Sequence, residues 1–134
     1  MERTLIIVKP DAVARGLVGQ VLSRFEAAGF EIVHVRFELL PEELVRRFYA
    51  EHEGKWYCAR LVDFMLSGPS LFAAVRRDEA IHRARNLAGA TDPCEAAPGT
   101  IRGDLGENLP RNCVHASDSP ESAEREIGLI FGGD

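Results

Sequence analysis

Blocks of apolar residues along the chain predict an alternation of strands and helices. Residues 4–9 (TLIIVK) form a continuous apolar run rich in β-branched side chains, which is typical of a buried central strand. Residues 33–39 alternate between apolar and polar side chains, which predicts a half-buried strand with one polar, solvent-facing side. A third strand is predicted over residues 71–75, and a short fourth one just before His115.

Helices are predicted where apolar residues recur at three- and four-residue spacing. The clearest helix start is Ser119-Pro120, because Ser is a good N-cap and Pro suits the first helical position. Asp78 is predicted to cap another helix, and Gly29 and Gly89 follow two predicted helix ends. The predicted helical segments are 18–28, 41–52, 61–66, 79–88 and 120–131.

The periodic pattern stops between residues 91 and 112, which are rich in Gly and Pro. A loop of about twenty residues is unusual within a compact domain and is often functional. A linker is the alternative, but too few residues follow it to build a second domain. We therefore expect a single domain over residues 1–134, with the strands and helices of an α+β layered fold.

Composition and charge exclude several classes of protein. The 134-residue chain has a net charge of −5, which argues against broad nucleic-acid binding while leaving room for a local basic pocket. It has no apolar run of the roughly 18 residues that a membrane span needs, and no secretory signal precedes the first strand. Its three cysteines form no C-x-x-C pair, so we expect a cytoplasmic protein without a zinc site.

The strongest candidate for chemistry is His115. It directly precedes a cluster of small polar residues and the N-terminus of the last predicted helix, a place that favours anions such as phosphate. An imidazole is mostly neutral at pH 7, so a ring nitrogen can attack phosphorus without a separate base. Glu126, two turns into that helix, can hold the other ring nitrogen. The alternative is a structural histidine with no catalytic role.

Five separated motifs occur in an order that resembles the nucleoside diphosphate kinase family. They are KPDAVARG, SGP, GATDP, PGTIRGD and NCVHASDS, and the similarity extends from Arg3 to Phe131. The resemblance implies a ferredoxin-like α/β sandwich, with a four-stranded antiparallel sheet covered by helices. One departure is Ala116, which stands where the family carries a glycine after the histidine. The chain has no P-loop, so any nucleotide must be bound by dispersed side chains.

The resemblance implies ping-pong transfer of a γ-phosphoryl group from a nucleoside triphosphate to a nucleoside diphosphate. His115 would carry the phosphoryl group as a phosphohistidine, bonded through Nδ1. Mg²⁺ is expected as the cofactor, held mainly by the nucleotide phosphates and water rather than by protein ligands. The implied catalytic residues are His115, Lys9, Tyr49, Ser117 and Glu126. The implied nucleotide-binding residues are Lys9, Tyr57, Arg85, Thr91, Arg102, Leu109 and Asn112.

Several alternatives stay open at this point. Tyr57 is expected to stack on the base and Leu109 to pack against it, but Trp56, one position away, competes for the stacking role. A non-catalytic nucleotide-binding regulatory module, or an interaction domain without phosphotransfer, could use the same fold. The resemblance also implies a homo-oligomer, built from dimers into a tetramer or hexamer.

Overall fold

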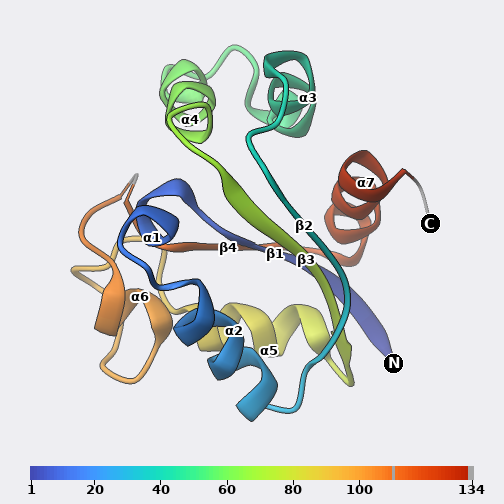
Figure 1. Cartoon of the computed structure of the whole chain (residues 1–134), viewed down its shortest axis with the longest axis vertical. Helices are drawn as coiled ribbons and strands as arrows, with labels where there is room; N and C mark the ends of the chain where they lie inside the picture. The colour runs from blue at the N-terminus through green and yellow to red at the C-terminus, as the bar shows by residue number, and fades with distance from the viewer. Residues whose placement is uncertain (110, 133–134) are drawn as a thin grey trace.

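The computed structural model of the chain describes residues 1–109 and 111–132. It contains one four-stranded antiparallel sheet made of β1 (Glu2–Val8), β2 (Glu31–Glu38), β3 (Ser70–Arg77) and β4 (Val114–Ala116), in the order β2-β3-β1-β4 (Figure 1). The predicted α+β class and four-stranded antiparallel sheet are therefore confirmed.

Two layers of helices enclose the sheet (Figure 1). One face packs against residues of α1 (Pro10–Ala14), α2 (Val18–Ala27), α5 (Ala80–Ala88) and α6 (Ile101–Leu105). The other face packs against residues of α3 (Glu42–Phe48), α4 (Cys58–Met65) and α7 (Pro120–Phe131), and a short 3-10 helix, η1 (Ala50–His52), follows α3.

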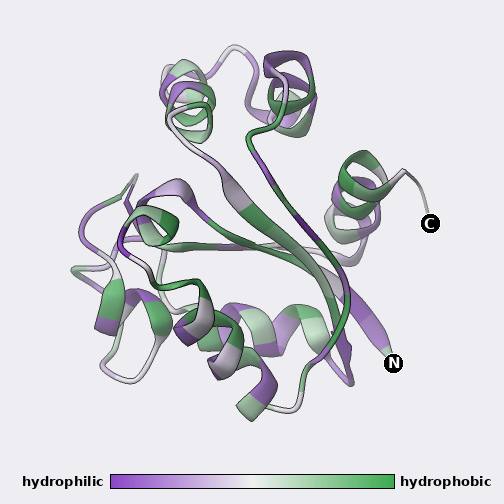
Figure 2. Ribbon diagram, viewed as in Figure 1, coloured by the Kyte–Doolittle hydropathy of each residue, from purple (hydrophilic) through white to green (hydrophobic). Residues whose placement is uncertain are grey.

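The central strand β1 serves both hydrophobic layers, which explains its continuous apolar run. Leu5 and Ile7 are fully buried against the α3, α4 and α7 layer, whereas Ile6 and Val8 are fully buried against the opposite layer. The hydropathy colouring in Figure 2 shows helices on which hydrophobic and hydrophilic stretches alternate, as expected for helices with one buried face. His115 pairs with Ile7 across the sheet, so the two side chains share a face and His115 points toward the α7 layer.

Helix α7 begins as predicted, whereas α5 does not. The Ser119 hydroxyl accepts a hydrogen bond from the Ser122 N–H at 3.0 Å, and Pro120 occupies the first helical position. Asp78 is not the cap of α5, because the helix is preceded by Glu79 in a left-handed conformation with φ 54°. The carboxylate of Glu2 reaches that helix end instead and accepts from the Ile81 N–H at 2.8 Å.

The interpretation of β2 is wrong in one respect. The strand exists, but its apolar side is not buried, since Val35, Phe37 and Leu39 are each about half exposed (51–53%). On the other side, Arg36 donates to the Ile130 carbonyl of α7 at 2.5 Å. β2 is an outer strand of the sheet, and alternation alone does not say which side another element covers.

Two short helices were not predicted. Pro10 and Asp11 open α1 rather than only ending the strand, and α6 lies inside the segment interpreted as an irregular loop. Each helix has five residues, which is too few for hydrophobic periodicity to show. The Thr100 hydroxyl caps α6 by accepting from the Gly103 N–H at 3.0 Å.

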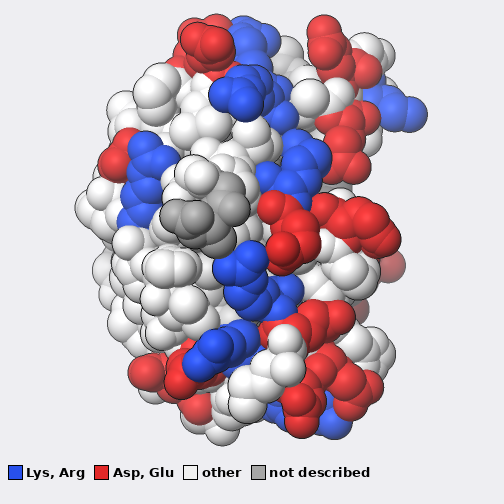
Figure 3. Space-filling view, turned by 90° about the vertical axis from the view of Figure 1, so that its right-hand side faces the viewer, with Lys and Arg blue, Asp and Glu red and all other residues white. Residues whose placement is uncertain are grey.

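Most of the ion pairs lie at the surface of the molecule. Figure 3 shows basic and acidic side chains interspersed over one face. Examples are Arg3 with Glu124 at 3.1 Å and Arg46 with Glu42 at 2.8 Å. Such exposed pairs contribute only about 0–1 kcal/mol each, so burial of the two apolar layers dominates stability. Within residues 1–109 and 111–132, every helix is too short or too polar to serve as a membrane span.

Candidate active site

The imidazole of His115 is held by a buried carboxylate. His115 Nε2 lies 2.8 Å from Oε1 of Glu126, whose side chain is only 6% exposed, while that of His115 is 24% exposed. The same carboxylate oxygen accepts a hydrogen bond from the Ser117 hydroxyl at 2.8 Å. A neutral imidazole bonded to a carboxylate in this way carries its proton on Nε2, which leaves the lone pair on Nδ1.

Local structure explains why these three residues meet. β4 presents His115 on the α7 side of the sheet, and capping by Ser119 starts α7 so that Glu126 lies two turns farther along. Ser117 is fully buried, and its hydroxyl also accepts from the Leu5 N–H of β1 at 3.3 Å. The group is therefore anchored to both the sheet and the last helix.

Two aromatic residues from the end of α3 close this side of the site. The Phe48 ring meets the His115 ring edge to face, with centroids 5.5 Å apart. Tyr49 is buried beside Phe48, and burial together with the charge of Glu126 raises the pKa of its phenol. Tyr49 therefore stays a neutral hydroxyl over the physiological pH range.

Two arginines bind the backbone on either side of His115. Arg102 donates from Nη2 to the Val114 carbonyl at 2.8 Å, and Arg85 donates from Nη1 to the Ala116 carbonyl at 3.2 Å. Arg102 also donates to the Gly89 carbonyl at 2.7 Å. Burial and the neighbouring charge of Arg85 lower the pKa of Arg102 to about 10, so it remains a cation at neutral pH. Its Nε is buried and has no partner within the described parts of the chain.

Lys9 is a buried amine at the end of β1. Its Nζ donates to Oδ1 of Asn112 at 2.9 Å and lies 5.4 Å from the ring centre of Phe64. Burial, opposed by the carboxylate of Asp11, lowers the pKa of Lys9 to about 8. Asn112 in turn donates from Nδ2 to the Thr91 carbonyl at 3.0 Å, so the structure brings Lys9, Asn112 and Thr91 together.

The predicted base-binding residues lie on exposed or half-exposed segments. The Tyr57 hydroxyl is 3.1 Å from Nδ1 of His52, and its ring meets Trp56 edge to face at 5.6 Å. Trp56 is 79% exposed and lies under the guanidinium of Arg60. Leu109 is 56% exposed. Across residues 1–109 and 111–132, no hydrogen bond or ring contact joins Tyr57 or Leu109 directly to His115 or Lys9.

Sequence reasoning missed one buried acid beside the site. Asp11 is 3% exposed, and its Oδ2 accepts from the Cys113 N–H at 3.0 Å. Its position two residues after Lys9, within the KPDAVARG motif, was the available signal.

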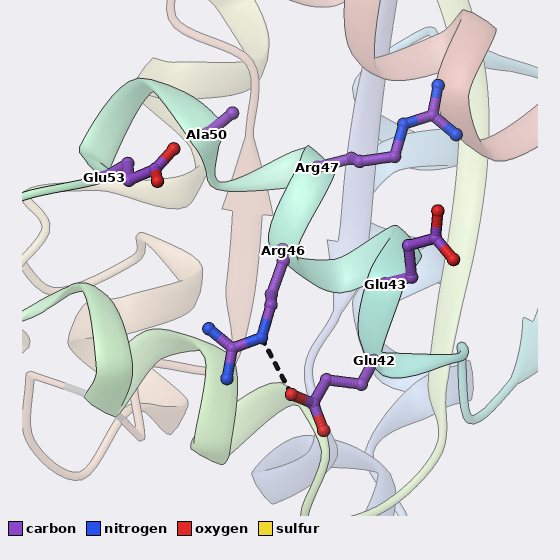
Figure 4. A pocket seen from close by; sticks show the side chains of 6 residues that line it. All are labelled: Glu42, Glu43, Arg46, Arg47, Ala50 and Glu53. Carbon is purple, nitrogen blue, oxygen red and sulfur yellow. Dashed lines mark hydrogen bonds and ion pairs between the residues drawn. The ribbon is translucent and has the colours of Figure 1, made fainter.

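The hollow drawn in Figure 4 belongs to a different part of the surface. It is lined by side chains of α3, by Ala50 of η1 and by Glu53 just after η1, and Arg46 pairs there with Glu42. None of its lining residues is a predicted site residue. Throughout residues 1–109 and 111–132, no group of three or more His, Cys, Asp or Glu side chains is arranged to hold a metal ion.

A histidine fixed by a carboxylate and flanked by two arginines, one buried and one exposed, on an antiparallel α+β sheet, is typical of a phosphotransferase-type site. Comparison with known proteins gives the family: a family model described as "Nucleoside diphosphate kinase" matches residues 2–134. The chain belongs to the nucleoside diphosphate kinase family and has that phosphotransferase activity in nucleotide metabolism.

The similarity extends over whole chains. Nucleoside diphosphate kinases of Archaeoglobus fulgidus and Methanococcus maripaludis are each 52% identical, over 100% and 98% of this chain and 89% and 99% of theirs. The crystal structure of the Aquifex aeolicus enzyme matches with a TM-score of 0.96 at 44% identity, covering 98% of this chain and 96% of that one. The Halobacterium salinarum enzyme, solved in complex with CDP, matches with a TM-score of 0.94 at 45% identity, covering 97% and 87%. These matches agree with the predicted ferredoxin-like fold.

Proposed function

We propose that the chain moves the γ-phosphoryl group between nucleotides in a ping-pong reaction, with a phosphohistidine on His115 as the intermediate. One observation carries this proposal. The 2.8 Å contact between His115 Nε2 and the buried carboxylate of Glu126 directs the Nδ1 lone pair outward as the nucleophile. Ser117 holds the same carboxylate oxygen and thereby fixes its orientation.

In the first half-reaction, Nδ1 attacks the γ-phosphorus and the bond from that phosphorus to the β-phosphate oxygen breaks. The diphosphate leaves with the electron pair of that bond, and the Glu126 carboxylate stabilises the positive charge that develops on the ring. In the second half-reaction, a terminal oxygen of another nucleoside diphosphate attacks the phosphorus, and the P–N bond electrons return to Nδ1. No external acid or base is required in either direction.

Three cations, of which Lys9 and Arg102 are buried and Arg85 is exposed, are proposed to stabilise the charge of the transferring group. The phosphoryl transition state spreads negative charge over its equatorial oxygens, so fixed donors supply most of the catalysis. Arg102 and Arg85 flank His115 through the carbonyls of its two neighbours. We assign Lys9 to the phosphates and a ribose hydroxyl, Asn112 to the sugar, Thr91 to a phosphate and Tyr49 to hydroxyl donation.

Base binding is proposed to depend on stacking against Tyr57, with Leu109 on the other side. The bond from the Tyr57 hydroxyl to His52 restrains the ring, which supports Tyr57 over the more exposed Trp56. Stacking tolerates any base because every base has a π-face, so we expect broad nucleobase use.

Mg²⁺ is proposed to arrive with the nucleotide. The hydrogen-bond donors near His115 are cationic and amidic, which suits phosphate oxygens. Since residues 1–109 and 111–132 supply no cluster of acidic, His or Cys side chains for a metal, the phosphates and water would be its ligands. When bound with the nucleotide, Mg²⁺ would neutralise part of the phosphate charge.

We further propose that the protein is a cytoplasmic homo-oligomer that does not bind nucleic acid broadly. The exposed apolar side chains Val35, Phe37 and Leu39 on an outer strand support self-association of dimers, because such surface is usually covered. The three cysteines are all unpaired, which supports a reducing compartment. The net charge of −5 disfavours general attraction to nucleic acid.

Labelling with γ-³²P-ATP tests the central proposal. The wild-type protein should take up acid-labile, base-stable label, and added unlabelled nucleoside diphosphate should remove it as labelled triphosphate. The non-catalytic rival predicts nucleotide binding without any covalent label. Label retained by a His115→Ala variant would refute the assigned nucleophile.

A further inference from the structure

Asp11 is a buried acid that none of the proposed roles uses. It lies in the first turn of α1, directly after the strand that ends at Lys9, and is 3% exposed. Its Oδ2 accepts from the Cys113 N–H at 3.0 Å, while the Cys113 carbonyl accepts from the Lys9 N–H at 2.8 Å. Both backbone groups of Cys113 are therefore held by the segment that carries Lys9.

Cys113 occupies a conformation that needs such support. Its φ is 72°, in the left-handed region that side chains other than glycine rarely adopt. The Asn112 carbonyl accepts from the Val114 N–H at 2.8 Å, so Cys113 is the central residue of a γ-turn. This turn directs the Asn112 side chain toward Lys9 and leads into β4, where His115 is two residues away.

Asp11 also acts on the charge of Lys9. The groups that influence Lys9 are Asp11 from α1, Arg102 from α6, and Cys113 from the turn before β4. Burial and Arg102 lower the pKa of Lys9, and the Asp11 carboxylate opposes them. Asp11 Oδ1 is buried and has no hydrogen-bond partner within the described ranges 1–109 and 111–132. The Asp11 carboxylate therefore has only one of its two oxygens in a hydrogen bond.

We propose that Asp11 is a positioning residue for the phosphotransfer reaction: its carboxylate fixes the γ-turn that orients Asn112 and His115, and supplies the negative charge that balances buried Lys9. The inference rests on the proposed function, because it assigns Lys9 and Asn112 to nucleotide binding. It adds a residue that touches neither the phosphates nor the imidazole.

Nucleotide binding measured against pH tests the charge component. Asp11→Asn keeps an oxygen that can accept from the Cys113 N–H but removes the charge, so Lys9 should lose its proton at lower pH. The affinity of Asp11→Asn for ADP should equal or exceed the wild-type value at pH 6.5 and fall about tenfold below it at pH 9, the effect of a shift of about one unit. Asp78→Asn, an exposed carboxylate on the turn before α5, should follow the wild type throughout. A ratio of Asp11→Asn to wild-type affinity that stays constant over this range would overturn the charge component.

Comparison of Asp11→Ala with Asp11→Asn tests the turn component. At pH 6.5, where Lys9 is protonated in both variants, Asp11→Asn should label His115 at nearly the wild-type rate. Asp11→Ala, which leaves the Cys113 N–H without its acceptor, should label it at least tenfold more slowly. Equal rates for the two variants at pH 6.5 would overturn the turn component.

The two levels of the proposal fail differently. If the wild-type protein binds ADP with the expected pH dependence but takes up no label, the phosphohistidine proposal fails and the influence of Asp11 on Lys9 stands. If label forms normally, the pH dependence of Asp11→Asn matches that of the wild type and Asp11→Ala labels His115 as fast as Asp11→Asn, the role of Asp11 fails and the phosphohistidine proposal stands.

Discussion

The polar groups on the two sides of β4 differ in how far their interactions are completed. On the α7 side, His115, Ser117 and Glu126 bond to one another, and the carboxylate is already paired with the imidazole. The second region contains the cations Lys9, Arg85 and Arg102. These three side chains donate hydrogen bonds only to carbonyl and amide oxygens. None of these three cations has a carboxylate within 4.0 Å among the described ion pairs, although many surface arginines do.

This difference means that the orientation of His115 and the neutralisation of phosphate charge depend on separate groups of residues. His115, the proposed nucleophile, is oriented by the protein alone, so its geometry is complete before a nucleotide binds. Neither Arg85 nor Arg102 is paired with a carboxylate among the described ion pairs, and the Asp11 carboxylate opposes the effect of burial on the pKa of Lys9 only in part. Burial penalises the charged forms of Lys9 and Arg102, which is why the pKa values of these two groups are lowered. In the proposed reaction a bound triphosphate supplies negative charge to these cations, so nucleotide binding and transition-state stabilisation would use the same groups.

Loss of the nucleophile should have the largest effect. His115→Ala removes the only group proposed to form the covalent intermediate, so kcat/KM should fall by about 10⁴-fold or more. Nucleotide affinity should change little, because the cations remain. Steady-state kinetics together with calorimetric titration of ADP measures both quantities. Loss of affinity parallel to loss of activity would mean that the two sides of β4 are not separable.

Removal of a cation should be the next largest effect. Arg102→Ala should lower kcat/KM by about 10²–10³-fold, because a donor to the transferring phosphoryl group is lost. It should also destabilise the fold by about 1–3 kcal/mol, since the buried carbonyls of Gly89 and Val114 lose their donor. Arg83→Ala, an exposed arginine of α5 paired with Glu79, is the matched control and should change neither value appreciably. Denaturant unfolding and steady-state kinetics check the pair.

Changing the carboxylate that orients His115 should have a smaller effect on activity. Glu126→Gln keeps the shape of the side chain but removes the charge that stabilises the phosphorylated ring, so the rate of label uptake should fall by about 100-fold. ADP affinity should remain near the wild-type value, because Glu126 faces the imidazole and Ser117 rather than the cations. Rapid-quench measurement of the first half-reaction gives the rate. An unchanged rate would remove Glu126 from the mechanism.

The pH dependence of kcat/KM should show the contribution of the cation Lys9. Lys9 is a cation below its pKa of about 8, so the wild-type kcat/KM should fall as pH rises through that value, approaching tenfold per pH unit. Lys9→Arg should be less active but should lack this fall, because a guanidinium does not deprotonate. Lys55→Arg, a conservative change at an exposed lysine, should keep the wild-type profile. A persistent fall near pH 8 in Lys9→Arg would assign the titration to another group.

The smallest expected effect on activity concerns the residue that stacks on the nucleobase. Tyr57→Ala should raise the KM for nucleotides by about tenfold, the cost of losing one stacking partner, with kcat little changed. Trp56→Ala should stay within about twofold of the wild type, because its ring is 79% exposed. Parallel kinetics on both variants decides between the two rings, and the reverse order would move the stacking role to Trp56.

The sequence predicted well those features that repeat or have strong local signals. The buried run of β1 and the Ser119-Pro120 start of α7 are both found, and together they place His115 and Glu126. Short or non-local features were missed. The helices α1 and α6 are too short for hydrophobic periodicity to show. The start of α5 is bonded by the carboxylate of Glu2, which lies far from it in the sequence, rather than by the predicted cap Asp78.

The resemblance, rather than periodicity, pointed to the separated site residues. Nothing in the spacing of Lys9 and Asn112 indicates that they meet at 2.9 Å across more than a hundred residues. The role of Asp11 was missed for a similar reason, since its partner Cys113 lies next to it only because β4 pairs with β1. The exposure of Val35 and Phe37 likewise depends on β2 being an outer strand, which alternation does not reveal.

The atom that carries the phosphoryl group tests the account most directly. Two-dimensional ¹H–¹⁵N NMR of the histidine-labelled protein, recorded after treatment with ATP, distinguishes phosphorylation at Nδ1 from that at Nε2. The account predicts a phosphoryl group on Nδ1 of His115, with Nε2 still protonated and bonded to Glu126. A phosphoryl group on Nε2, or on any of the other three histidines in the chain, would contradict it.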